Sequence, residues 1–256
     1  MQMKNVLKDV IRHTHDLGEF EAFKLIVTNE GTGTIKASSK DVSVTLEGVI
    51  KDNIKDFIST EEEKTLIGFA RLNILAGYLK SPIFEDENSY LEVGYMDNGT
   101  EIPRELVFKT DQGHRCTYRM MQPEIARKRI KTYSATMPLS DDDFEIIFTP
   151  DETFLKEFQS FSSILGKVSN TFSLSVEDHL LYMNLGEDDT AKIPVTETDI
   201  ETMEAINFWP VKQVLGILKQ APDLSGVTIY VSNENSLIDI KVDTDHVSYS
   251  YKLTAS

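Results

Sequence analysis

The chain has 256 residues, 40% of them hydrophobic, and a formal net charge of -16 at pH 7. This length suits one large domain or two of ordinary size, and the acidic balance argues against a protein that binds nucleic acid with its whole surface. No apolar run reaches the roughly 20 residues of a membrane-spanning helix, and the first ten residues lack the apolar stretch of a secretory signal. Because Cys116 is the only cysteine, no disulfide can form within the chain, and we expect a cytoplasmic protein.

The first half begins with a predicted helix and continues with strands. The helix covers residues 5–16, where the apolar residues share one face. Alternating apolar and polar residues predict strands between residues 23 and 50. Further strands are expected at residues 90–95, 106–109 and 114–121. Asn98, Gly99 and Thr100 match a glycosylation acceptor, but in a cytoplasmic chain this segment is better interpreted as a hairpin turn.

A change of composition in the middle of the chain predicts a domain boundary. Residues 122–143 contain Pro123, a basic run at residues 127–131 and an acidic run at residues 141–143. We interpret this segment as a connector between two domains. The expected organisation is an N-terminal domain over residues 1–121, a connector over residues 122–143 and a C-terminal domain over residues 144–256.

The second half repeats the order of the first. A strand at residues 144–148 leads into a helix for which Thr149 is the predicted N-cap, with Pro150 at the first helical position and a capping box to Glu152. Gly166 is expected to end this helix. Its predicted apolar face consists of Phe154, Leu155, Phe158, Phe161 and Leu165. The strands expected after it are residues 171–176, 180–184, 192–196, 236–242 and 247–253.

One stretch of the chain occurs twice. Residues 205–231 resemble residues 66–93, and each copy contains an apolar run, an amphipathic helix, a proline and a strand. The aligned pairs are Ile206 on Ile67, Phe208 on Phe69, Gly216 on Gly77, Leu218 on Leu79 and Lys219 on Lys80. The alternative is that any two amphipathic segments share some apolar positions. The flanking elements also align, so we predict an α+β protein of two similar domains, each helix–strands–helix–strands, with Trp209 in the core.

The sequence contains no convincing catalytic or metal-binding pattern. His13 and His15, two residues apart on a helix, point about 200° apart and cannot share one ion. The acidic run at residues 141–143 lacks the glycine-punctuated spacing of a calcium loop. His114 and Cys116 alternate to opposite faces of a strand, which disfavours a nucleophile pair. We therefore expect a protein that is not an enzyme and that needs no metal or cofactor.

The distribution of acidic residues is more informative. Asp and Glu make up 42 of the 256 residues, yet residues 66–84 and 205–222 contain none, and both gaps fall on the repeated helix. The predicted outer faces of the four helices are basic or neutral, which suggests a shared surface facing a polyanion. Their outward residues are Lys4, Lys8 and Arg12 in the first helix, Asn73 and Lys80 in the second, Lys156, Gln159, Ser163 and Lys167 in the third, and Lys212 and Lys219 in the fourth.

Two similar domains with basic helix faces in an acidic chain resemble the DNA sliding clamps. This family includes the proliferating-cell nuclear antigen and the clamps of T-even-type bacteriophages, and the phage type is the closer match because of residues 205–231. The basic run at residues 127–131 and residues 101–116 depart from the phage pattern. The resemblance implies a clamp fold, a homotrimeric ring around duplex DNA, and a processivity factor that tethers the replicative DNA polymerase after a clamp loader opens the ring.

The resemblance also implies two kinds of site. Non-specific phosphate contacts would come from Lys4, Lys8, Arg12, Asn73, Lys80, Lys156, Lys167, Lys212 and Lys219. A pocket for the tail of the polymerase would include Met137, Pro138, Leu139, Tyr251 and Leu253, for which ordinary packing is an equal alternative.

Two other functions stay open at the level of sequence. One is an adaptor or transcription coactivator of the same fold, which would bind polymerase subunits or RNA polymerase-associated factors and contact little DNA. The other is an enzyme with an unrecognised site. The mass in solution separates the clamp from both alternatives, since a ring of three subunits has three times the mass of the chain, whereas a monomer favours the adaptor or the enzyme.

Overall fold

The computed structural model describes residues 3–58, 62–85, 89–96, 102–131, 140–167, 169–186 and 188–255. These residues form two compact units, which are described separately. The first is Met1–Tyr133 with Asp245–Tyr249, and the second is Ser134–Thr244 with Ser250–Ser256. Within the described ranges, no helix is both long enough and apolar enough to cross a membrane.

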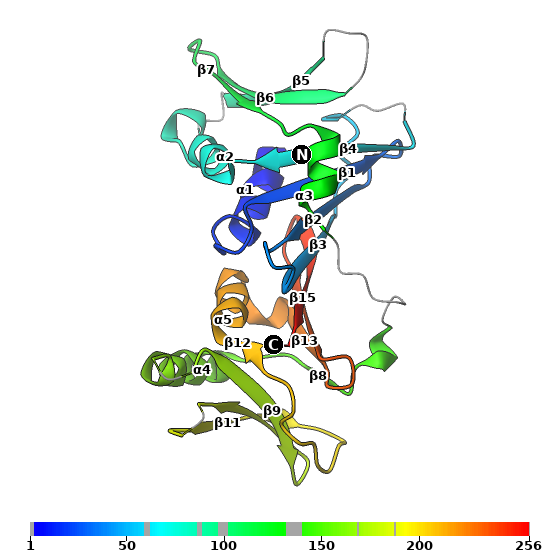
Figure 1. The fold of residues 1–256 in the computed structure, drawn as a ribbon. Helices are drawn as coiled ribbons and strands as arrows, with labels where there is room; N and C mark the ends of the chain where they lie inside the picture. Colours follow the sequence, from blue (N-terminus) through cyan, green and yellow to red (C-terminus); the bar gives the residue numbers. More distant parts are fainter. Residues whose placement is uncertain are drawn as a thin grey trace. The chain divides into compact units, whose positions relative to one another are not determined.

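The first unit contains three α-helices and two antiparallel sheets (Figure 1). Strands β1 to β4 lie in the order β4-β1-β2-β3, and the second sheet has the order β5-β6-β7. Its elements are α1 (Met3–His13), β1 (Ala22–Thr28), β2 (Gly33–Ser38), β3 (Val44–Ile50), β4 (Lys64–Ala70), α2 (Leu72–Leu79), the 3-10 helix η1 (Pro82–Phe84), β5 (Ser89–Tyr95), β6 (Pro103–Thr110), β7 (Arg115–Arg119) and α3 (Pro123–Arg129).

The second unit has the same kinds of element. Four strands lie in the order β11-β10-β9-β12, and four others lie in the order β15-β14-β13-β8. The elements are η2 (Asp141–Asp143), β8 (Ile146–Phe148), α4 (Glu152–Leu165), β9 (Thr171–Glu177), β10 (Leu180–Leu185), β11 (Ala191–Glu197), β12 (Trp209–Pro210), α5 (Val211–Gln220), η3 (Leu224–Gly226), β13 (Val227–Ser232), β14 (Leu237–Asp243) and β15 (Val247–Thr254). The first three residues of β15 belong to the first unit.

The strand orders confirm the predicted duplication. In chain order, β1, β2, β3, β4 and α2 of the first unit correspond to β9, β10, β11, β12 and α5 of the second. The sheet order β4-β1-β2-β3 becomes β12-β9-β10-β11. In the first unit α1 packs on α2, and in the second α4 packs on α5. The α+β fold with two helix–strands–helix–strands halves is therefore present.

The register of the strands corrects the alignment of the two copies. Phe69 pairs with Phe23 on β1, and Trp209 pairs with Phe172 on β9. Trp209, predicted to be core, is fully buried and is the counterpart of Phe69. The aligned Phe208 is instead 44% exposed. The alignment holds in the helices, and it slips by one residue in the strands.

An extra residue causes the slip. Arg71 stands between the end of β4 and the start of α2 in the left-handed conformation, with φ 53° and ψ 49°. In the second copy, Pro210 ends β12 and Val211 starts α5 with no residue between them. Ile206, aligned with the buried Ile67, lies before β12 and is 62% exposed.

The start of α4 also differs from the prediction. Asp151, not Thr149, is the N-cap, and its Oδ1 accepts a hydrogen bond of 2.7 Å from the backbone N–H of Phe154. A carboxylate at this position both accepts the hydrogen bond and complements the positive end of the helix dipole. Gly166 ends α4 as predicted. Phe161, predicted on the apolar face, is 37% exposed, because α4 buries only a narrow stripe.

Part of the expected connector is folded. Residues 123–129 form α3, which packs on β4, and the backbone carbonyl of Ile130 accepts a 2.9 Å hydrogen bond from Lys24 Nζ. Burial lowers the pKa of Lys24, with a smaller contribution from Lys36. Sequence periodicity did not reveal this helix because it is only seven residues long, from Pro123 to Arg129.

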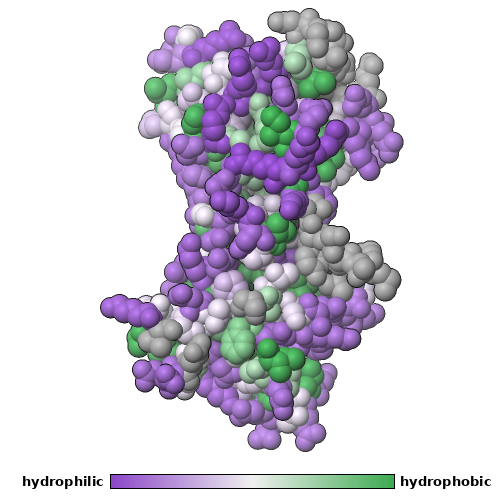
Figure 2. All heavy atoms as spheres, in the orientation of Figure 1, coloured by the Kyte–Doolittle hydropathy of each residue, from purple (hydrophilic) through white to green (hydrophobic). Residues whose placement is uncertain are grey.

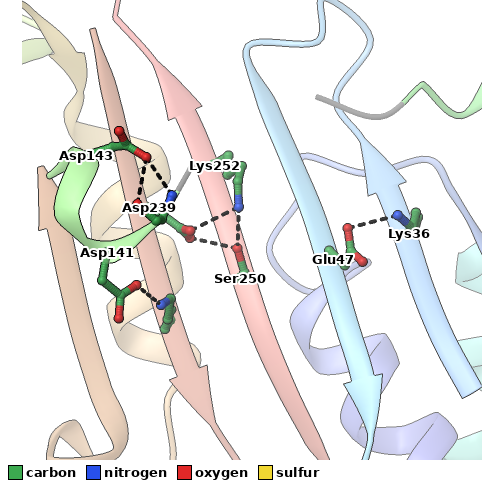
Figure 3. A network of polar contacts seen from close by, with 9 residues as sticks. Lys36, Glu47, Asp141, Asp143, Asp239, Ser250 and Lys252 are labelled. Carbon is green, nitrogen blue, oxygen red and sulfur yellow. Dashed lines mark hydrogen bonds and ion pairs between the residues drawn. The ribbon is translucent and has the colours of Figure 1, made fainter. Parts of the chain in front are cut away.

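Ion pairs link neighbouring strands within each unit. In the second unit, the buried Asp239 on β14 accepts hydrogen bonds from Ser250 Oγ at 2.7 Å and from Lys252 Nζ at 3.0 Å, both on β15 (Figure 3). In the first unit, Lys36 on β2 pairs with Glu47 on β3 at 2.9 Å (Figure 3). Pairing across strands offsets the cost of bringing the Asp239 carboxylate out of water.

Candidate nucleic-acid interface

The predicted interface depends on which cations the helices present. Helix α1 buries the stripe Val6, Leu7, Val10 and Ile11. On the side of the helix away from this stripe, Lys8 is half-buried and Arg12 is exposed. Lys8 Nζ lies 3.2 Å from Glu85 Oε1, so a carboxylate already balances its charge.

Lys4 occupies a different environment from the one expected of an outward residue. Its side chain is 9% exposed, and Nζ donates a 2.7 Å hydrogen bond to Ser89 Oγ on β5. The long aliphatic stem of a lysine can lie along an apolar surface while the amine reaches a polar partner. Helix periodicity placed Lys4 beside Lys8 but could not show its hydrogen bond with Ser89.

Helix α2 presents Asn73 and Lys80 to solvent, as the sequence predicts. Lys80 is the C-cap residue, and its Nζ lies 2.8 Å from Asp16 Oδ2, in the turn after α1. Arg71, just before the helix, donates a 3.1 Å hydrogen bond to the carbonyl of Arg119. The guanidinium also lies 5.9 Å from the centre of the Tyr118 ring. Both cations that flank α2 are therefore engaged within the first unit.

Helix α4 carries a mixed face. Lys156 is exposed, and its Nζ lies 3.7 Å from Glu152 Oε2, one turn earlier. Lys167 is also exposed, but it follows the C-cap Gly166 and so lies just beyond the helix. Two large apolar side chains, Phe161 and Ile164, share the outer side of α4.

Helix α5 has the cleanest basic face. It buries Val211, Val214, Leu215, Ile217 and Leu218. Its two exposed residues are Lys212 and Lys219, and the helix contains no acidic residue. Lys219 lies in the last turn, where a cation is favoured by the helix dipole.

The two units thus hold their cations differently. In the first, Lys8 and Lys80 face carboxylates at close range. In the second, Lys156 also lies near a carboxylate, Glu152, but the exposed Lys219 has no carboxylate partner among the described residues. Figure 2 shows hydrophilic side chains over most of the visible surface, with hydrophobic ones in small groups.

The residues expected to form the polymerase pocket lie in two places. Met137, Pro138 and Leu139 are outside the described residues, as is the predicted turn at Asn98 and Gly99. Tyr251 and Leu253 on β15 are fully buried. As they stand, these two side chains are part of the core and offer no surface to a peptide.

The basic run before the second unit lies on α3. Arg127, Lys128 and Arg129 form its last turn, and Arg129 Nη2 lies 2.7 Å from Glu21 Oε2. Cations at the end of a helix stabilise it through the helix dipole. The run therefore has a local structural role in the first unit.

His13 and His15 also differ in environment. His13 is fully buried, and its ring stacks on that of Tyr249, with the ring centres 4.3 Å apart. Burial, together with the nearby Arg12, lowers the pKa of His13 to about 3, so its imidazole is neutral at physiological pH. His15 is half-buried in the turn after α1. In the described part of the chain, no three His, Cys, Asp or Glu side chains come together as a possible metal site.

Sequence reasoning missed Glu85 and Asp16, the two carboxylates that balance Lys8 and Lys80. Asp16 is four residues after Arg12, so helix periodicity places it at the end of the basic face of α1. No local signal connects Glu85 to Lys8, since the contact depends on how η1 folds back after α2.

Comparisons with known proteins bear on the fold. No family model matches the chain, and no curated protein matches it in sequence. Solved structures do. The PCNA of Thermococcus kodakaraensis superposes with a TM-score of 0.68 at 13% identity, covering 99% of this chain and 97% of that one.

Two further structures agree. The PCNA of A. fulgidus, solved with the C-terminal region of FEN-1, gives a TM-score of 0.64 at 15% identity over 99% of this chain and 96% of the other. The PCNA2–PCNA3 complex of Sulfolobus tokodaii gives 0.65 at 12% identity over 97% and 96%. Because these superpositions cover nearly all of each chain, the protein has the two-domain fold of the PCNA sliding clamps.

Proposed function

We propose that the protein is a sliding clamp that encircles duplex DNA and acts as a processivity factor for the replicative DNA polymerase. The fold supports this proposal, because it matches PCNA structures over nearly the full length of both chains. The observation that carries it is α5, whose exposed positions are two lysines in a chain with a net charge of -16. An acidic protein that keeps one helix face free of carboxylates has a surface suited to phosphates.

A clamp needs only weak contacts with DNA. A ring closed around the duplex is held by topology, so its side chains can meet phosphates without reading bases, and this permits sliding. The candidates for such contacts are the exposed residues Arg12, Asn73, Lys156, Lys167, Lys212 and Lys219, together with Lys8 and Lys80 once they leave their carboxylates. Lys4 would first have to leave Ser89.

The ring would be formed by three copies of the chain. Strands β7 and β11 each end a sheet in the described part of the chain, so each has an edge available for pairing. The partners that follow from a clamp are the polymerase and a clamp loader. The finer assignment to the phage type, with a second role in transcription, rests on residues 205–231 alone.

The test combines mass in solution with salt-dependent DNA binding. A trimer has three times the 29.0 kDa chain mass, which light scattering measures directly. For the variant Lys212→Glu/Lys219→Glu, we expect weaker binding to two duplexes of unrelated sequence. The slope of log K against log salt should fall by about 1 for each lost phosphate contact.

The matched control is Lys40→Glu/Lys241→Glu. It makes the same charge change at Lys40, which is exposed after β2, and at Lys241 on β14, away from the basic helix faces and from the edges of β7 and β11. The control should bind DNA like the wild type. Equal losses in both variants would show that only net charge matters. A monomer with no salt slope would favour the adaptor function and overturn the clamp.

A further inference from the structure

A cavity of about 620 Å³ lies within the second unit, away from the helices considered above. Three segments line it: the start of β8, the turn between β9 and β10, and the segment after β11. The lining residues are Glu145, Ile146, Ile147, Asp178, His179, Leu180, Glu197, Thr198, Asp199 and Ile200.

The lining combines carboxylates with aliphatic side chains. Glu145, Asp178, Glu197 and Asp199 are all exposed, and the lining includes no lysine or arginine. Ile147 is 48% exposed beside them. Four carboxylates around an apolar surface repel phosphates and attract a cationic group that has an aliphatic neighbour.

Hydrogen bonds hold the walls in place. The backbone N–H of Thr198 donates to the carbonyl of His179 at 2.8 Å, which ties the segment after β11 to the β9–β10 turn. The carboxylate of Glu145 accepts from the backbone N–H groups of Asn233 and Glu234 at 2.9 and 3.0 Å. These hydrogen bonds fix the Glu145 carboxylate at one wall of the cavity.

The open edge of β8 indicates the shape of the ligand. Among the described residues, β8 ends its sheet and pairs only with β13. Ile146 and Ile147 of β8 line the cavity, whereas no residue of β13 is among the lining residues. The backbone groups on the unpaired side of β8 suit an extended peptide, which could add to the sheet as a further strand.

We propose that this cavity binds an extended segment of a partner protein in which Lys or Arg alternates with aliphatic residues. The peptide backbone pairs with β8, an aliphatic side chain covers Ile147, and the cations meet Asp178, Glu197 and Asp199. Tyr251 and Leu253 of the expected polymerase pocket are not among the residues that line this cavity. The proposal does not depend on DNA binding, so either one can fail alone.

The probe is a short fluorescein-labelled peptide of alternating Lys and Ile, with a Glu–Ile peptide as the opposite-charge probe. Binding to the full chain is followed by fluorescence anisotropy at low salt. The variant Asp178→Asn/Glu197→Gln/Asp199→Asn keeps the side-chain shapes and removes three charges. We expect it to weaken Lys–Ile binding about tenfold, since each exposed charge pair contributes modestly.

The control variant Asp142→Asn/Asp188→Asn/Asp189→Asn removes three exposed charges of the same unit outside the cavity. It should bind the peptide within about twofold of the wild type. Ile147→Ser should weaken binding several-fold, whereas Ile164→Ser on α4 should not. Thermal melts establish that all four variants fold.

Three results would overturn the proposal. The first is equal binding of the Lys–Ile peptide by the two triple variants. The second is that the wild type binds the Glu–Ile peptide as tightly as the Lys–Ile peptide. The third is full competition by arginine amide at the concentration of the peptide, because it would show a site for a small cation without pairing to β8.

Discussion

The two units enter their second helix in different ways. In the first, Arg71 forms a left-handed step between β4 and α2, and its side chain is held by the carbonyl of Arg119 and the ring of Tyr118. In the second, Pro210 leads directly from β12 into α5. Each junction still places one large aromatic residue in the core, Phe69 or Trp209. The buried residues of the strand and the buried face of the helix are therefore retained in both units, whereas the junction between strand and helix tolerates one additional residue.

The helices before the first strands differ as well. α1 ends on a buried, titratable His13, whereas the buried side chains of α4 are Phe154, Phe158 and Leu165. The buried His13 therefore makes the core of the first unit sensitive to acid, whereas the buried side chains of α4 do not titrate.

The largest expected effect tests the equivalence of Phe69 and Trp209. Truncating either residue to Ala leaves a cavity in the core and should lower the free energy of unfolding by about 3–5 kcal/mol. Phe208→Ala, at the exposed position aligned with Phe69 by sequence, should cost under about 1 kcal/mol. Urea unfolding followed by circular dichroism measures all three. If Phe208→Ala lowered the free energy of unfolding as much as Trp209→Ala, the shifted register would be contradicted and the sequence alignment of Phe208 with Phe69 would be favoured.

The next effect concerns pH. The unfolded chain protonates His13 near its usual pKa of 6.5, but the folded state does so only near pH 3. Between these values the unfolded state binds more protons, so acid favours unfolding. Stability of the first unit should fall by about 1.4 kcal/mol per pH unit as pH drops from 6 to 4.

His13→Phe should remove this slope, and His15→Gln should keep it. Hydrogen exchange at several pH values localises the effect to a unit. Loss of protection that begins in α4 and α5 would contradict the assignment to His13.

The smallest effect tests the extra residue. A left-handed residue with a Cβ costs about 1–2 kcal/mol relative to Gly, so Arg71→Gly should be more stable than Arg71→Ala by about 1 kcal/mol. At Lys80, where φ is -95°, Gly should bring no such gain over Ala. Thermal unfolding of the four variants gives the comparison. Equal stability of Arg71→Gly and Arg71→Ala would place the strain of the junction elsewhere.

Much of the fold followed from periodicity. Strands β8, β9, β10, β11, β14 and β15 and the end of α4 at Gly166 were predicted within two residues, and Trp209 was predicted to be buried. Strand β12 was not predicted as a strand. These features depend on neighbours in sequence, which alternation and turn residues report directly. The N-cap of α4 and the helix α3 were missed, because Thr149 and Asp151 are both good caps and α3 is short.

The candidate interface was predictable only in part. Exposure of Lys80, Lys156, Lys212 and Lys219 followed from helix spacing. The hydrogen bond of Lys4 with Ser89 and the pairing of Lys8 with Glu85 did not, because they join residues far apart in the chain. A charge count along a helix cannot show which charges are already balanced by another segment.

The single residue at Arg71 also explains why such a repeat is hard to detect. One offset between the halves superimposes the strands, and another, shorter by one, superimposes the helices. An alignment without gaps can match either the strands or the helices of the two halves, but not both. The repeat is therefore difficult to recognise in the sequence even though both copies have the same fold. A gap of one position at this junction restores the correspondence.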